Sequence, residues 1–234
     1  MKRVAAAVGG SVLVPSLEEN RLKAWAETLI RLHENGIQVF AVVGGGGEAR
    51  RYIEACRGLS LDEASSDEIG IMVTRINAAL LIGALKDYAY PRVAESYLQA
   101  KEFAVSGKIV VMGGVTPGQT TDAVSAVLAE EVGASMMLDL TAVDGIYSAD
   151  PKKDPSAVKY AAMTPAELIN LIMKEKMNAG SNMIIDLVAA KVTERSGIPL
   201  VVMDGRDPKL LEEALLDGKF NGTVVGEGKD LFPL

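Results

Sequence analysis

Short apolar runs alternate with longer helix-like stretches along this chain of 234 residues, and the alternation limits the folds open to it. The runs cover residues 4–8, 38–43, 108–112, 135–140 and 199–203. Each is bounded by glycine or polar residues, as in strands that are buried on both faces. Helices are expected at residues 17–35, 48–57, 67–87, 121–132, 165–177, 183–196 and 208–217. This order predicts an α/β protein, a three-layer α/β/α sandwich around a mainly parallel central sheet.

The remaining segments complete the predicted architecture. Residues 220–226 are typical of a late strand at the edge of the sheet. Helix starts are expected at Ser65-Ser66-Asp67 and at Thr164-Pro165, where Glu167 falls in the first turn. The chain contains neither a low-complexity linker nor an internal repeat. We therefore expect a single domain over residues 1–234.

Composition excludes several classes of protein. The formal net charge is −7 and the isoelectric point is near 4.9, whereas binding a nucleic-acid polymer through its phosphates needs a basic surface. The single cysteine, Cys56, cannot form an intrachain disulfide or a thiolate zinc cluster and is expected to be packed. The single histidine, His33, is expected to be an ordinary helix residue. Neither a Ser-His-Asp triad nor a metal site built by the protein is therefore predicted.

The N-terminal segment has two interpretations. Lys2 and Arg3 precede an apolar run over residues 4–14, as in a secretory signal peptide. The run contains Gly9-Gly10-Ser11 and leads into a charged helix, which favours a buried first strand followed by a turn. No stretch approaches the ~18 uninterrupted apolar residues of a membrane span. We therefore expect a cytoplasmic protein without a membrane partner.

Glycines cluster directly after four of the predicted strands, at Gly9-Gly10-Ser11, at residues 44–47, at Gly113-Gly114 with Pro117-Gly118, and at Asp144-Gly145. Any one of them could be an ordinary tight turn. The carboxyl ends of parallel strands lie along one edge of a sheet, where ligands bind in open α/β folds. Four clusters in succession therefore predict one cleft at that edge.

Glycine-rich turns that open onto helices suit phosphate, because bare backbone N–H groups and the positive helix end can approach anionic oxygens. The turn at residues 44–47 leads into a helix that carries Arg50 and Arg51. Arg50 lies nearer the turn and is the better phosphate candidate, whereas Arg51 is expected to face solvent. Neither GxxxxGK[ST] nor GxGxxG occurs, which weighs against P-loop and Rossmann cofactor sites.

Together these segments resemble the amino acid kinase superfamily and, within it, the archaeal-type uridylate (UMP) kinases. The matching segments are GGSVLVP (9–15), VVGGGGEARRYIE (42–54), SSDEIGIMVTRINA (65–78), VVMGGVTPGQTTDAVSA (110–126), TAVDGIYSADPKKDP (141–155) and AGSNMIIDLVAAKVTERSGI (179–198). The combination of GGxxPGxTTDA with DGxYxxDPKxDP is specific. The glycine turns alone are shared with relatives that phosphorylate carboxylates, carbamate or isopentenyl phosphate.

The resemblance implies the amino acid kinase fold and transfer of the ATP γ-phosphoryl group to UMP, which gives UDP in pyrimidine nucleotide biosynthesis. It also implies Mg2+ held mainly by nucleotide phosphates, and a homohexamer. A kinase for another small phosphate acceptor is one alternative; a non-catalytic nucleotide- or oxyanion-binding or storage protein is another. The latter is favoured by Ala7, where many members have a lysine and archaeal relatives often have an acidic residue. It is also favoured by Glu48, where archaeal relatives commonly have a lysine.

The resemblance assigns roles residue by residue. It implies ATP binding by Gly10, Ser11, Gly46, Arg50, Thr141, Tyr147 and Asp150. It implies UMP binding by Gly45, Asp67, Val115, Thr116, Pro117, Gly118, Gln119, Thr120 and Thr121. Arg50 and Asp122 are the expected catalytic residues, Arg50 by neutralising charge and Asp122 by organising the reacting centre. Asp67 and Asp122 each lie at an expected helix start, so a helix cap is the alternative role for both.

Overall fold

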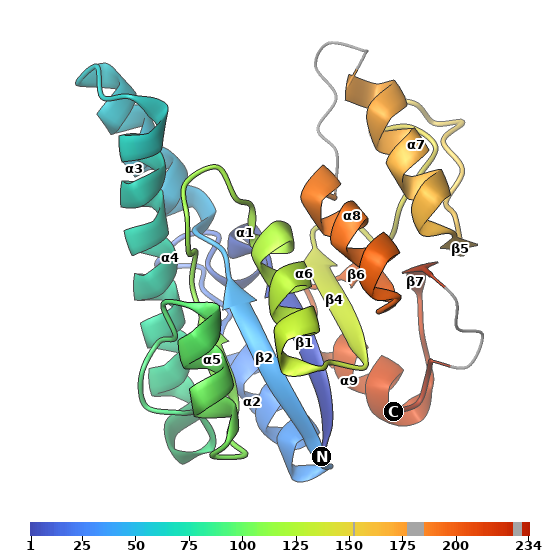
Figure 1. Cartoon of the computed structure of the whole chain (residues 1–234), viewed down its shortest axis with the longest axis horizontal. Coiled ribbons are helices and arrows are strands. Elements are labelled where there is room, and N and C mark those ends of the chain that lie inside the picture. The colour runs from blue at the N-terminus through green and yellow to red at the C-terminus, as the bar shows by residue number, and fades with distance from the viewer. Residues whose placement is uncertain (152, 177–184, 227–230) are drawn as a thin grey trace.

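The computed structural model describes residues 1–234 except 152, 177–184 and 227–230. Its described residues form a seven-stranded sheet in the order β3-β2-β1-β4-β6-β7-β5 (Figure 1). The strands are β1 Lys2–Val8, β2 Ile37–Val43, β3 Val110–Met112, β4 Met136–Thr141, β5 Ala162–Met163, β6 Leu200–Asp204 and β7 Gly222–Val225. The predicted sandwich with a mainly parallel sheet is confirmed, because among the seven described strands only β6 and β7 pair in antiparallel fashion.

Helices cover both faces of the sheet. They are α1 Gly10–Leu13, α2 Leu22–Glu34, α3 Gly46–Gly58, α4 Glu63–Leu85, α5 Tyr97–Ala104, α6 Thr121–Val132, α7 Pro165–Lys176, α8 Leu187–Ser196 and α9 Lys209–Asp217, with a short 3-10 turn at Lys86–Tyr88. Alternate residues of each strand face opposite layers. One core joins the sheet to α1, α2, α4 and α9, and the other joins it to α5, α6, α7 and α8. Helix α3 packs on α4, outside the first layer (Figure 1).

Side-chain caps place the starts of α4, α8 and α7, and the first two of these starts differ from the sequence prediction. The expected start at Ser65-Ser66-Asp67 is wrong, because Asp62 Oδ1 accepts from Ser65 N at 2.8 Å and α4 begins at Glu63. The helix expected at 183–196 begins at Leu187, where Asp186 accepts from Val188 N at 2.6 Å. The start at Thr164-Pro165 is confirmed by reciprocal bonds between Thr164 and Glu167. The predicted residues Met177 and Met183 lie outside the described residues.

The other differences arise where short segments gain stability only from tertiary neighbours. The helix expected from residue 17 begins at Leu22, and the turn after β1 forms the extra helix α1. Neither α5 nor the two-residue strand β5 was predicted. The predicted edge strand at 220–226 is β7, which lies one strand in from the edge because β5 pairs along its outer side. A single apolar run cannot reveal such a pairing.

One segment differs from the expectation on membrane spans. Glu63–Tyr88 is long and apolar enough to cross a membrane by length and composition, although charged residues interrupt it. One such helix is weak evidence for a span, since the core helix of a soluble protein passes the same test. Here α4 packs against α2 and α3, and Ala78, Leu81 and Leu85 lie in the core.

Candidate functional site

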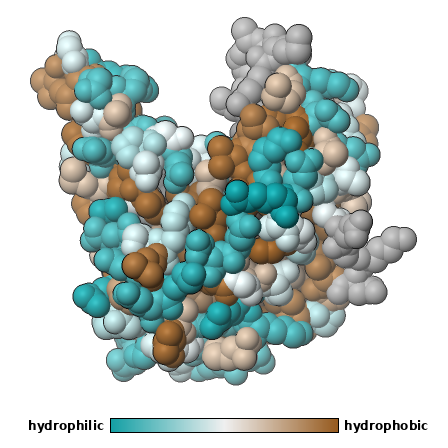
Figure 2. All heavy atoms as spheres, in the orientation of Figure 1, coloured by the Kyte–Doolittle hydropathy of each residue, from teal (hydrophilic) through white to brown (hydrophobic). Residues whose placement is uncertain are grey.

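The site lies at the carboxyl edge of the parallel strands. Figure 1 shows β2 and β4 pointing toward the same end of the molecule, and Figure 2 shows that end hollowed between the α3 side and the α7–α8 side. Hydrogen bonds tie the turns along this edge to one another. Gly9 N donates to Leu140 O at 3.1 Å, and Gly205 N donates to Thr141 O at 2.8 Å. The ends of β1, β4 and β6 therefore form one continuous rim.

The first two glycine turns are packed backbone to backbone. A Cβ on Gly10 would collide with the backbone nitrogen of Gly46, and a Cβ on Gly44 would lie 3.3 Å from both the Gly10 Cα and the Thr121 Oγ1. Gly46 also has a φ of +68°, which side-chain-bearing residues rarely adopt. Glycine is therefore required by close approach at Gly10 and additionally by conformation at Gly46. These contacts bring the first and second turns together and place Thr121, which follows the third cluster along the chain, beside them.

Asn77 on α4 fixes the second glycine turn, at residues 44–47, by hydrogen bonds to its backbone. This α4 residue is 2% exposed, and its Nδ2 donates to the carbonyls of Gly44 and Gly45 at 3.1 and 3.2 Å. Two carbonyl groups of the turn are thereby satisfied, and Gly44 N donates to Val8 O at 3.0 Å, which ties the turn to the end of β1. Sequence reasoning missed Asn77, because an asparagine inside an apolar helical run gives no sign of the distant backbone it meets.

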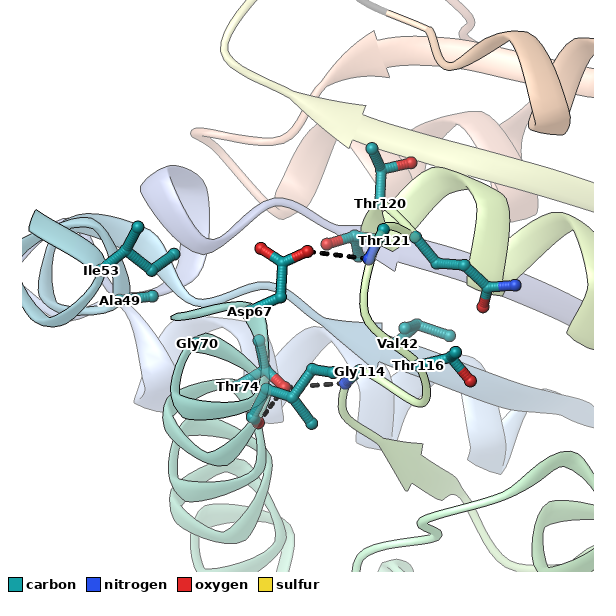
Figure 3. A pocket seen from close by; sticks show the side chains of 13 residues that line it. Val42, Ala49, Ile53, Asp67, Gly70, Thr74, Gly114, Thr116, Thr120 and Thr121 are labelled. Atoms are coloured by element: carbon teal, nitrogen blue, oxygen red, sulfur yellow. Dashed lines mark hydrogen bonds between the residues drawn. The ribbon is translucent and has the colours of Figure 1, made fainter. Parts of the chain in front are cut away.

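Two further bonds join α4 to the loop after β3 (Figure 3). Asp67 Oδ2 accepts from Gly118 N at 2.8 Å. Thr74 Oγ1 accepts from Gly114 N at 2.7 Å and donates to Ile71 O at 2.7 Å. The cap role considered for Asp67 is wrong, because Asp62 caps α4. Asp67 instead closes the loop against the helix, and Thr74 was also missed by sequence reasoning.

A cavity of about 150 Å³ lies between α3, α4 and this loop (Figure 3). Six residues expected to bind UMP line it: Asp67, Thr116, Gly118, Gln119, Thr120 and Thr121. Val42, Ala49, Ile53 and Ile71 supply apolar walls. Gly45, Val115 and Pro117 do not line it. The cavity thus combines one carboxylate and several hydroxyl and backbone groups with an apolar side, which suits a small molecule that has both polar groups and an apolar face.

The start of α6 shows which residue caps this helix, a role that the sequence left open for Asp122. Thr120 is the N-cap, since its hydroxyl accepts from Ala123 N at 3.2 Å. The cap role considered for Asp122 is therefore wrong. Burial and the neighbouring charge of Asp186 raise the pKa of Asp122 to about 7, although a hydrogen bond from the Asp186 backbone N–H opposes the rise. Asp122 is thus a carboxyl whose ionised form is disfavoured, at the carboxyl edge of the sheet.

A second group of polar residues lies beyond the ends of β4 and β6. Asp144 accepts from Tyr147 Oη at 2.8 Å and from Lys159 Nζ at 3.0 Å. Burial alone would raise the pKa of Asp144, but these two hydrogen bonds and the charge of Lys159 lower it below its usual range. Arg206 pairs with Asp204 at the end of β6, and its hydrogen bond lowers the pKa of that carboxyl. Thr141 and Tyr147 therefore lie in a polar rim that Asp204 and Arg206 extend.

The fourth glycine cluster does not join the other three. A Cβ on Gly145 would lie 2.7 Å from Thr223 Oγ1, so this turn packs against β7. Thr223 Oγ1 accepts from Ile146 N at 2.8 Å and so fixes the start of the following loop. Asp150 is exposed in that loop, beside Lys153 at 3.8 Å. The position of Asp150 relative to the polar rim therefore depends on the conformation of this loop and not on the end of a strand.

The exposed charges near the turns differ in their partners. Arg51 pairs with Glu48 at 3.1 Å and its side chain is 76% exposed, as the solvent-facing expectation requires. Arg50 is exposed, and no ion pair is found for it within the part of the chain that the structure describes. Ser11 is exposed at the first turn of α1. Arg50 and Ser11 are therefore both accessible to a ligand.

No group of three His, Cys, Asp or Glu side chains among the described residues could hold a metal ion.

Comparisons with known proteins point in one direction. A model of the amino acid kinase family matches residues 2–204. A protein of Methanocorpusculum labreanum described as uridylate kinase is 75% identical over 234 residues, which is 100% of both chains. One of Methanoculleus marisnigri with the same description is 58% identical and covers 97% of each chain. The crystal structure of uridylate kinase from Archaeoglobus fulgidus has a TM-score of 0.85 at 42% identity, covering 97% of this chain and 100% of that one.

Proposed function

Because the chain belongs to the amino acid kinase family, we propose that it is a uridylate kinase, which transfers the γ-phosphoryl group of ATP to UMP and releases ADP and UDP. The full-length similarity to archaeal proteins described as uridylate kinases supports this substrate pair. The proposal treats residues 1–234 as one domain that contains the whole site.

UMP binds in the cavity between α4 and the loop after β3. Asp67 accepts hydrogen bonds from the ribose hydroxyls with the oxygen that Gly118 leaves free. The backbone from Val115 to Gln119, with Pro117 shaping the turn, surrounds the nucleotide. The Thr120 and Thr121 hydroxyls and the Gly45 N–H meet the phosphate. Thr120 can do so because its cap bond uses only its acceptor role.

ATP lies across the rim from the first two glycine turns toward β6. Gly10, Ser11 and Gly46 present backbone N–H groups to its phosphates. Thr141, Tyr147 and Asp150 line the adenosine side. Arg50 neutralises charge on the transferred phosphoryl group, with Asp122 beside the reacting centre.

The reaction needs no side chain to remove a proton, because the nucleophile is a UMP phosphate oxygen that is already anionic at neutral pH. The chain's residues therefore orient two phosphates in line and offset their charge. Mg2+ bound mainly by the nucleotide phosphates would supply further charge neutralisation. This requirement matches the glycine turns, the hydroxyls and the exposed Arg50 among the described residues of the site.

The observation that carries the proposal is the bond from Gly118 N to Asp67 Oδ2 at 2.8 Å, since it closes the cavity around the predicted UMP residues. The test is incubation of the purified chain with Mg-ATP and each nucleoside monophosphate separately, with chromatographic detection of the diphosphate. UDP formed from UMP alone is the expected result.

Two other outcomes would replace the proposal. Product from a different phosphate or carboxylate acceptor would assign another kinase activity. Binding of UMP and ATP by calorimetry without any diphosphate would assign a nucleotide-binding protein that has lost turnover, the alternative that Ala7 and Glu48 favour.

The proposed protein is a cytoplasmic homohexamer that binds neither membranes nor nucleic-acid polymers. Support for assembly comes from Met72, Ile76 and Leu80, which form an apolar stripe on α4 and are 56%, 58% and 42% exposed. Light scattering should give a mass near six chains, and Ile76→Glu should lower it. A monomer at micromolar concentration in the unsubstituted protein would contradict this part of the proposal.

A further inference from the structure

Asp139 is a buried carboxyl in the centre of the sheet. It lies on β4, where its register partners are Ala7 on β1 and Val202 on β6. It is 3% exposed, and its Oδ2 has no hydrogen-bond partner among the described residues. An ionised carboxylate in such apolar surroundings is costly unless a donor or a proton compensates it.

The charges that affect the pKa of Asp139 and of its neighbour Asp122 belong to other carboxyls. Asp139 shares its face of the sheet with Met137, and α6 and α8 cover that face. After burial, the charge of Asp122 in the first turn of α6 is what raises the pKa of Asp139 well above its usual range. Asp186, the N-cap of α8, acts in turn on Asp122 through its charge and its backbone N–H.

These neighbours decide which of the two carboxyls keeps a proton. Asp122 is half-buried and receives the Asp186 N–H, which favours its ionised form. Asp139 is deeper, and its Oδ2 receives no donor. Two carboxyls whose charges act on each other in a poorly solvated site do not both ionise near neutral pH. The deeper burial of Asp139 and its unpaired Oδ2 favour the proton there, and Asp122 is the carboxyl whose charge acts on it.

We propose that Asp139 is a positioning residue of the phosphoryl-transfer site, which remains protonated and whose O–H holds the Asp122 carboxylate at the carboxyl edge, directly or through one water. The inference rests on the proposed function for its catalytic consequence. Ala7, the register partner of Asp139 on β1, brings no charged or polar side chain to this part of the sheet. A retained proton also removes one negative charge from the edge where two nucleotides bring their phosphates together.

A shared proton accounts for the closeness of the Asp122 and Asp139 charges better than a metal ion does. The described carboxyls include no set of three that could hold a metal ion. A proton needs only one donor and one acceptor within reach, which Asp139 and Asp122 supply.

The test compares the unsubstituted protein with Asp139→Asn and Asp139→Val from about pH 5.5 to about pH 9. Asn keeps a donor but cannot ionise, whereas Val removes the donor. We expect kcat of the unsubstituted protein to fall as the pair loses its proton, and Asp139→Asn to lack that fall. Asp139→Val should lose about tenfold in kcat at every pH, equivalent to about 1.4 kcal/mol, with little change in KM for UMP or ATP. Asp87→Asn, which removes an exposed carboxyl, controls for net charge.

Thermal unfolding separates this proposal from the proposed reaction. Because the folded-state pKa of Asp139 is raised, the stability it contributes is present at low pH and lost as pH rises. Asp139→Asn should therefore gain in melting temperature over the unsubstituted protein as pH rises, whether or not UDP is formed. Unchanged pH profiles of kcat and melting temperature in Asp139→Asn would overturn the proposal, as would full kcat in Asp139→Val. If Asp139→Val does not fold, the Asn comparison decides alone.

Discussion

Asp67 Oδ2 accepts a 2.8 Å hydrogen bond from Gly118 N and so joins the first turns of α4 to the loop that precedes α6. The bond spans 51 residues of sequence. It closes one side of the cavity and leaves the second carboxylate oxygen available to a ligand. A residue that could have served as a simple helix cap therefore shapes the candidate UMP site.

Asp67→Ala should weaken UMP binding selectively. It removes both the loop contact and the acceptor for the ribose, and hydrogen bonds to charged groups contribute about 1.5–3 kcal/mol. We expect KM for UMP to rise by roughly tenfold or more, with KM for ATP little changed. Glu68→Ala, at the exposed neighbouring position, is the matched control. Equal KM values for UMP in the two variants would remove Asp67 from the site.

Gly10→Ala should destabilise the fold, because the new methyl group would collide with the backbone of Gly46. Overpacking of this kind costs about 1–3 kcal/mol. Gly83→Ala on α4 is the control, since a Cβ there meets nothing within 4 Å. The control should gain about 0.5–1 kcal/mol from helix propensity. Urea denaturation measures both, and equal stabilities would show that the two turns do not need their close approach.

Arg50→Ala should slow the reaction more than Arg51→Ala does. Arg51 already pairs with Glu48, whereas no ion pair is found for Arg50 in the described part of the chain. Loss of one charge-assisted contact at the transferred group should lower kcat/KM by roughly 10- to 100-fold. Steady-state kinetics of the two variants give the comparison. Wild-type kinetics in Arg50→Ala would withdraw its catalytic role.

Arg206→Ala should make a small, pH-dependent difference to stability. The Arg206 hydrogen bond lowers the pKa of Asp204, so its stabilising effect is present above the unfolded-state pKa and is lost as pH falls through the folded-state value. The Arg206 side chain is 57% exposed, which limits the effect to under about 1 kcal/mol. Lys191→Ala, which breaks the exposed pair with Glu194, is the control. A difference that grows toward acidic pH would contradict this account.

The parallel sheet and its two helical layers could be predicted from sequence, because each strand and each long helix carries its own apolar period. Capped starts were harder to place. Asp62 and Asp67 are both acceptable caps by residue type, and Asp62 alone lies where its oxygen reaches Ser65 N. The strand β5 and helix α5 were not predicted, since two and eight residues give too short a pattern.

The candidate site divides in the same way. Sequence identified the turns that contain Gly10, Gly44 and Gly118, because glycine after a buried strand is a local signal. It did not identify Asn77, Thr74 or Asp139. Each of these meets a partner that lies more than 30 residues away or on a neighbouring strand.

The sequence by itself therefore determined the order of elements, the glycine turns at the strand ends and the family resemblance. These features depend on residues that are close along the chain. The tertiary structure decided which turns meet, that Asp67 and Thr74 hold one loop, and that Asp139 lies beside Ala7 under α6. Such pairings depend on strand order and layer packing, which bring distant residues together only once the whole sheet has formed.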